Sequence, residues 1–135
     1  MIVIDTSALV AIMLNEPERN RFLDALDTAE GILISAGTLM EVRMVAHGRG
    51  GQPLVRMLDD LLLDYGVEIV PPGATEIEAA HAAFVAYGRG SGHPAKLNFG
   101  DLFGYALAKV RGLPLMFKGA DFSRTVIECA LASPV

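Results

Sequence analysis

The first ten residues, MIVIDTSALV, constrain the fold more than any other stretch of the chain. Apolar β-forming residues run into Asp5, two hydroxyl residues follow, and an apolar stretch resumes through Leu14. This pattern predicts a short buried strand ending at Asp5 and a helix opening at Thr6 or Ser7. In an open parallel sheet, ligands bind beyond the carboxyl ends of the strands, which is where this arrangement puts Asp5. The alternative is that Asp5 or Ser7 only caps the helix.

The alternation of short strands and helices continues along the whole chain. Further strands are predicted at residues 31–35, 67–70 and 115–117, with a last short one at 126–127. Helices are predicted over residues 19–28, 38–47, 53–65, 74–87 and 101–111, with stops at residues 48–51 and at Gly112. No repeat or linker interrupts the pattern, so we expect a single domain over residues 1–135. Its class should be α/β, a sandwich with a mostly parallel sheet.

The chain is more apolar than most soluble monomers of its size, with 52% hydrophobic residues and a mean hydropathy of +0.40. The longest apolar run, residues 8–14, is far too short to span a membrane, and no signal peptide is expected. The excess therefore indicates a large core or a partner surface, with residues 9–14 and 54–63 as candidate linings. Cys129 is the only cysteine, which fits a cytoplasmic protein without disulfides.

The formal charge of −5 argues at first against a nucleic-acid partner. Four acids, however, are candidates for one site at strand or helix ends: Asp5, Glu41, Asp101 and Asp121. Without these four, acids and bases nearly balance. The composition therefore does not exclude an anionic substrate.

Three of these acids also have simpler explanations that the sequence leaves open. Thr38 and Glu41 fit a capping box, in which the glutamate reaches back to the start of its helix. Asp101 falls in the first turn of a helix, where the helix dipole favours an acid. Asp121 lies in a glycine-containing turn, where aspartate is common. None of these explanations accounts for four acids at the same edge of one sheet.

A cluster of carboxylates has one obvious use, because oxygen ligands suit hard cations such as Mg²⁺ or Mn²⁺. These metals hold phosphate oxygens and activate water. Four neighbouring side chains could orient the acids by hydrogen bonding: Thr6, Ser7, Ser35 and Asn98. The three histidines share no zinc-ligand spacing with each other or with cysteine, so a zinc site is not expected.

Four short motifs resemble those of PIN domains, and most closely those of the VapC toxin ribonucleases of bacterial and archaeal toxin–antitoxin pairs. In chain order they are IDTSA at residues 4–8, IS at 34–35 followed by EV at 41–42, LNFGD at 97–101 and KGADF at 118–122. They extend across nearly the whole chain. The resemblance implies a three-layer α/β/α sandwich.

The resemblance also implies an activity. Asp5, Glu41, Asp101 and Asp121 would form an acidic catalytic pocket, in which Asp5, Asp101 and Asp121 hold Mg²⁺ or Mn²⁺ for endonucleolytic cleavage of RNA. It further implies a homodimer and a small VapB-like antitoxin as partner. Arg89, His93 and Lys96, in or beside a glycine-rich loop, are candidate contacts to RNA phosphates.

The chain departs from the family pattern at two positions. Relatives often carry Asp or Asn where Ala120 stands, and Asp where Val126 stands. These departures put a second metal in question and keep open a different class of function, a non-catalytic PIN-fold module that binds RNA or protein. A haloacid-dehalogenase-like phosphatase would need an aspartate where Ser7 stands, so that class is disfavoured.

Overall fold

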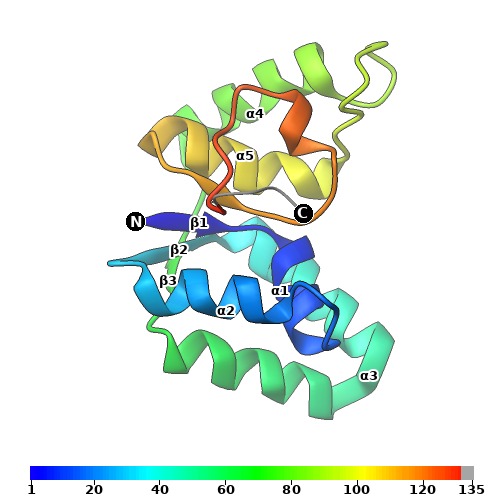
Figure 1. Cartoon of the computed structure of the whole chain (residues 1–135). Coiled ribbons are helices and arrows are strands. Elements are labelled where there is room, and N and C mark those ends of the chain that lie inside the picture. Colours follow the sequence, from blue (N-terminus) through cyan, green and yellow to red (C-terminus); the bar gives the residue numbers. More distant parts are fainter. Residues whose placement is uncertain (132–135) are drawn as a thin grey trace.

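Figure 1 shows the computed structural model of the chain, which describes residues 1–131. Four short strands form one sheet in the order β3-β2-β1-β4. Their bounds are Ile2–Ile4 for β1, Ile32–Ser35 for β2, Glu68–Val70 for β3 and Leu115–Met116 for β4. Every neighbouring pair is parallel, and Val3 of β1 lies in register with Leu33 on one side and Leu115 on the other. The predicted parallel sheet is thus confirmed.

Alternating side chains of the strands enter two separate cores. Ile2 and Ile4 of β1, together with Ile34 of β2, pack into the first core. Val3 and Leu33 point the other way and pack into the second. Because successive side chains of a strand face opposite sides, a strand buried on both faces reads as a continuous apolar run.

Helices cover both faces of the sheet and complete the predicted three layers (Figure 1). The first core lies under α1 (Thr6–Met13), α2 (Arg19–Thr28) and α3 (Ala36–Asp64). The second lies under α4 (Ala74–Tyr87) and α5 (Phe99–Arg111). A 3₁₀ turn, η1 (Phe122–Arg124), follows β4. Among residues 1–131, no helix is long and apolar enough to cross a membrane.

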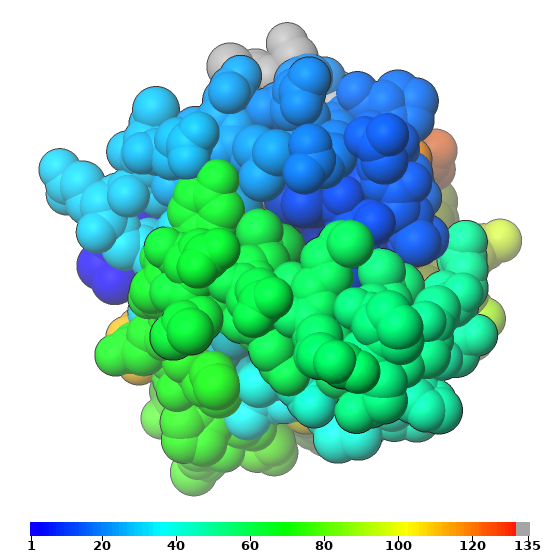
Figure 2. Space-filling model, turned by 90° about the horizontal axis from the view of Figure 1, so that it is seen from below, coloured from blue at the N-terminus to red at the C-terminus, as the bar shows by residue number. Residues whose placement is uncertain are grey.

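The helices predicted at 38–47 and 53–65 form one bent element, α3. Residues 48–50, predicted as a stop, are helical, and only Gly51 leaves helical geometry, with φ 65° and ψ −158°. Arg43 and Asp59 form an ion pair between the two arms of the bend. Figure 2 looks onto the side of the molecule that α2 and α3 cover, and the second arm of α3 (green) runs across it.

Two further expectations are corrected. Residues 126–127 do not form a strand. The chain instead pairs with β4 at Cys129, where Leu115 N donates to Glu128 O and Leu115 O accepts from Ala130 N, each at 2.9 Å. Residues 9–14 do not line an open surface either, because Leu9, Ile12 and Met13 are buried in the first core.

Candidate active site

Asp5 lies at the carboxyl end of β1 and is only 3% exposed. Its Oδ2 accepts hydrogen bonds from the Ser7 backbone N at 3.0 Å and from Ser7 Oγ at 2.6 Å, so Asp5 does cap α1. Its Oδ1 is buried and has no partner among residues 1–131. Burial raises the pKa of Asp5 to about 7, the bonds from Ser7 oppose this rise, and the charges of Asp101 and Glu41 add to it.

Glu41 lies in α3, and its carboxylate reaches away from the start of its own helix. Oε1 accepts from Thr6 Oγ1 at 2.6 Å, which ties α3 to the residue directly after Asp5. The capping box with Thr38 does not form, because α3 begins at Ala36 with Ser35 as its N-cap. The other carboxylate oxygen lies so close to Gly100 of α5 that a Cβ atom there would overlap it.

Asp101 lies in the first turn of α5 and forms a capping box with Asn98. Asn98 N donates to Asp101 Oδ2, and Asp101 N donates to Asn98 Oδ1, both at 2.9 Å. Asp101 therefore does cap the start of α5, as one interpretation of the sequence proposed. Burial nevertheless affects its pKa more than this hydrogen bond does. Burial raises the pKa of Asp101 to about 6 against the bond from Asn98, and the charges of Asp121 and Glu41 raise it further.

Asp121 is exposed and directly precedes η1, on the connection that leaves β4. Its charge acts on Asp101, while the charges of Asp101 and Glu41 act on Asp5. Asp101 is therefore within electrostatic range of the other three acids, and Asp5 is also within range of Glu41. Such like charges disfavour full ionisation in the absence of a cation.

These acids offer the oxygen ligands that hard divalent cations prefer, but they are not drawn together into a metal site. Among residues 1–131, no group of three or more His, Cys, Asp or Glu side chains is placed to hold a metal as it stands. Asp5 nevertheless presents a buried carboxylate oxygen with no hydrogen-bond partner. Orphaned buried acceptors are costly, and a carboxylate oxygen is a ligand that hard cations take.

The four polar side chains expected to orient the acids divide into two groups. Thr6, Ser7 and Asn98 each bond one acid: Glu41, Asp5 and Asp101 respectively. Ser35 instead uses its Oγ to accept from Gly37 N at 3.3 Å as the cap of α3. In the part of the chain that the structure describes, Ser35 has no hydrogen bond to any of the acids.

Two residues next to Asp5, Thr38 and Gly104, were not among the site residues predicted from the sequence. Thr38 is fully buried, and its Oγ1 has no partner among the described residues. A Cβ on Gly104 would lie 3.6 Å from Asp5 Oδ1 and 3.8 Å from Thr38 Oγ1, so both orphaned oxygens border the same point of α5. A buried helical threonine has no signature in a single sequence, and only the crossing of α3 and α5 reveals it.

The candidate RNA contacts surround an open hollow of about 650 Å³ beside the acids. Arg89, His93 and Lys96 line it together with Asp121. The charge of Arg89 lowers the pKa of Asp101, which places the guanidinium within range of the acidic site. The loop is closed by hydrogen bonds from Arg89 N to Leu97 O and from Leu97 N to Tyr87 O. Cationic side chains therefore border the carboxylates.

Comparison with known proteins gives consistent matches along the chain. The sequence model of the PIN domain matches residues 2–128. Ribonuclease VapC42 of Mycobacterium tuberculosis is 41% identical over 128 residues, which is 95% of this chain and 98% of the relative. Ribonuclease VapC30 of the same organism is 45% identical over 125 residues, covering 93% and 95%.

Solved structures share the fold at lower identity. VapC20 of M. tuberculosis, described as a toxin that cleaves the sarcin–ricin loop, has a TM-score of 0.76 at 18% identity, covering 94% of this chain and 96% of its own. A toxin–antitoxin complex from Klebsiella pneumoniae has a TM-score of 0.69 at 22% identity, covering 100% and 98%. VapBC2 of Rickettsia felis, bound to a promoter DNA fragment, has a TM-score of 0.74 at 18% identity, covering 96% of each chain.

Proposed function

Because this chain belongs to the PIN-domain family, we propose that it is a VapC-type toxin ribonuclease, an endonuclease that hydrolyses RNA phosphodiester bonds with Mg²⁺ or Mn²⁺. One observation carries the proposal: buried Asp5, with an unpartnered oxygen, lies within electrostatic range of Glu41 and Asp101. Relatives at 41% and 45% identity that are named ribonucleases support it.

Asp5, Asp101 and Asp121 would hold the cation, which when bound activates water and stabilises the charge that develops on the phosphate. Ser7 fixes the Asp5 carboxylate through Oδ2 and leaves Oδ1 without a hydrogen-bond partner. Asn98 occupies only Oδ2 of Asp101. Ala120 and Val126 leave Asp121 as the only carboxylate between residues 118 and 126, so we propose no second cation.

Glu41 would complete the catalytic acids. Its hydrogen bond from Thr6 and the absence of a side chain at Gly100 hold its carboxylate against the first turn of α5. From this position it can accept a proton or a hydrogen bond from water near the scissile phosphate.

Two features beside the acids suit RNA. Arg89, His93 and Lys96 offer cationic or hydrogen-bonding groups to phosphates around the hollow. Phe99 is 78% exposed at the start of α5, and an edge contact with Phe103, at 5.0 Å between ring centroids, restrains its ring. An exposed aromatic ring can stack on an unpaired base, as proteins that read single-stranded RNA loops do.

We also propose a small VapB-like antitoxin as the partner, and a homodimer as the state of the free toxin. The toxin–antitoxin complexes that share this fold support the first proposal. The cytoplasmic location stays a prediction.

The test is an RNA cleavage assay on protein purified free of antitoxin. Structured RNA with unpaired loops should be cut with Mg²⁺ or Mn²⁺, and EDTA should abolish the cutting. The products should carry 5′-phosphate and 3′-hydroxyl ends, because water attacks the phosphorus and the ribose 2′-hydroxyl does not. Products ending in 2′,3′-cyclic phosphate would overturn the proposal. Tight RNA binding without any metal-dependent cleavage would indicate the non-catalytic module instead.

A further inference from the structure

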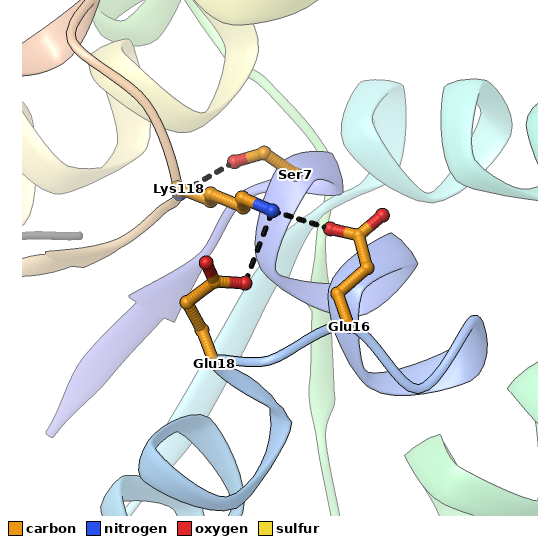
Figure 3. Close-up of polar contacts among 4 residues, drawn as sticks. All are labelled: Ser7, Glu16, Glu18 and Lys118. Carbon is orange, nitrogen blue, oxygen red and sulfur yellow. Dashed lines mark hydrogen bonds and ion pairs between the residues drawn. The ribbon is translucent and has the colours of Figure 1, made fainter.

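Lys118 lies between β4 and Asp121, and its side chain is held by two glutamates from another part of the chain. Figure 3 shows Nζ between Glu16 Oε1 at 2.7 Å and Glu18 Oε2 at 3.0 Å. The three side chains are 34%, 30% and 21% exposed, respectively, so the cluster is only partly hydrated. Both glutamates belong to the connection between α1 and α2.

The backbone of the same lysine is tied to the acidic site. Lys118 N donates to Ser7 Oγ at 2.9 Å (Figure 3). This hydroxyl in turn donates to Asp5 Oδ2 at 2.6 Å. Ser7 therefore joins the strand-end aspartate to the connection that carries Asp121.

The residues on either side of Lys118 explain why this connection needs an anchor. Phe117 packs into the second core, where its ring lies 5.2 Å from that of Phe122. After Lys118, Gly119 adopts φ 104°, a turn that favours glycine, and it is exposed with Ala120 and Asp121. The aromatic pair fixes the two ends of this segment, while Lys118 holds it on the side of α1 and α2.

We propose that Lys118, clamped by Glu16 and Glu18, is a positioning residue that fixes Asp121 relative to Asp5. It does not touch the substrate. An isolated exposed ion pair contributes little to stability. Here one ammonium bridges two carboxylates, and its own backbone bonds the hydroxyl that orients Asp5, so displacement of the lysine would shift two of the acids together. The inference rests on the proposed function only in that the acids bind metal.

The test compares Lys118→Met, which keeps the apolar stem, with Lys118→Arg, which keeps the charge. In metal-free protein, Lys118→Met should speed hydrogen exchange of the residue 118 amide, which donates to Ser7 Oγ, and leave the amides of α5 unchanged. Its affinity for Mn²⁺, measured by calorimetry, should fall roughly 10- to 100-fold, as for other residues that orient metal ligands. Lys118→Arg should largely keep the wild-type exchange rate and the wild-type affinity for Mn²⁺.

Two controls separate positioning from a general loss of charge or stability. Lys109→Met removes the same charge from the exposed far end of α5 and should change neither property. Glu16→Gln with Glu18→Gln should reproduce the effect of Lys118→Met, and adding Lys118→Met to this pair should cost little more. Unchanged exchange of the residue 118 amide in Lys118→Met would overturn the proposal. If the wild type bound no Mn²⁺, the proposed function would fail, while the exchange experiment would still decide the role of Lys118.

Discussion

Single residues at the acidic site are held in states that cost the metal-free protein stability. Asp5 is nearly inaccessible to water, and Asp101 is half-buried at the start of α5 beside Glu41. Burial raises both pKa values, to about 7 and about 6, even though each carboxylate accepts hydrogen bonds. This pattern is typical of functional sites, where a ligand supplies the compensation that the fold lacks.

The first prediction concerns the pH dependence of stability in EDTA. The native protein binds more protons than the unfolded chain between the ordinary pKa of Asp5, 3.8, and its folded value of about 7. The free energy of unfolding should therefore fall as pH rises from 4 to 8, by roughly 4 kcal/mol from Asp5 alone. Asp5→Asn should flatten this fall and be the more stable protein at pH 8. Urea denaturation at several pH values measures it, and a wild-type stability that rises over this range would refute the explanation.

The second prediction uses Gly100 to move Glu41 without altering a charge. Gly100→Ala places a methyl group where Glu41 Oε2 lies, and the flexible glutamate should swing away from Thr6. RNA cleavage should fall by at least an order of magnitude while circular dichroism stays unchanged, in line with the loss of a positioned acid–base group.

Gly48→Ala is the matched control, because nothing lies within 4 Å of the added Cβ. It should retain full activity. Full activity in Gly100→Ala as well would show that Glu41 is not required at its present position.

Asp5 and Asp101 could be predicted from sequence because strand ends and helix starts are local patterns. Their hydrogen-bonding side chains within three residues, Ser7 and Asn98, could be predicted for the same reason. Thr38 could not, since its relation to Asp5 depends on how α3 crosses α5. Ser35 follows its strand as expected, but its hydroxyl caps α3, a choice that the sequence leaves open.

Among the elements, α3 shows how one residue sets the shape of a layer. Gly51 has φ 65° and ψ −158°, a conformation essentially restricted to glycine. It lets the two arms of α3 fold together, so that Val42 and Leu58, from opposite arms, share the first core. The glycines at 48–51 predict a break, but the exact residue depends on the packing of the two arms.

The third prediction follows from that geometry. Gly51→Ala should destabilise the protein by about 1–3 kcal/mol, because alanine cannot adopt these angles without strain. Gly48→Ala, in helical geometry three residues earlier, should be neutral or slightly stabilising. Urea midpoints of the two variants provide the measurement. Equal stability of both would show that the bend does not require a glycine at 51.

The pairing of the strands could be predicted only in part. Short apolar runs ending in polar residues predict a parallel sheet, as observed. The pairing of the segment after η1 with β4 could not be predicted, because Val126, which looks like a strand residue, is 65% exposed and the pairing occurs at Cys129.

For the whole molecule, the apolar excess is divided between two cores and an exposed remainder. Residues 9–13 pack into or against the first core, whereas Met57 and Leu63 on the second arm of α3 remain exposed. Two open hollows are lined by α3, one by Met40 and Met44 and the other by Leu62 and Leu63 together with Ile69 of β3. An amphipathic segment of a partner could lay its apolar side in such hollows.

The fourth prediction concerns association. Light scattering should give the mass of a dimer for the free protein, and co-expression with a VapB-like antitoxin gene from beside its own should yield a stable complex. Leu63→Lys should weaken that complex, while Val85→Lys, an equally drastic change at an exposed residue of α4, should not. A monomer that forms no complex would contradict this account of the exposed apolar surface.

The most direct measurement is the melting temperature of wild type and Asp101→Asn, with EDTA and with Mn²⁺. If the acids form one metal site, the amide relieves repulsion and desolvation, so the metal-free variant should melt at or above the wild type. Mn²⁺ at about 100 times its Kd should stabilise the wild type by about 2.7 kcal/mol and the variant much less. If Asp101 only caps α5 with Asn98, the variant should instead melt lower without metal and respond to Mn²⁺ as the wild type does. That second outcome would contradict the metal site and the nuclease proposal built on it.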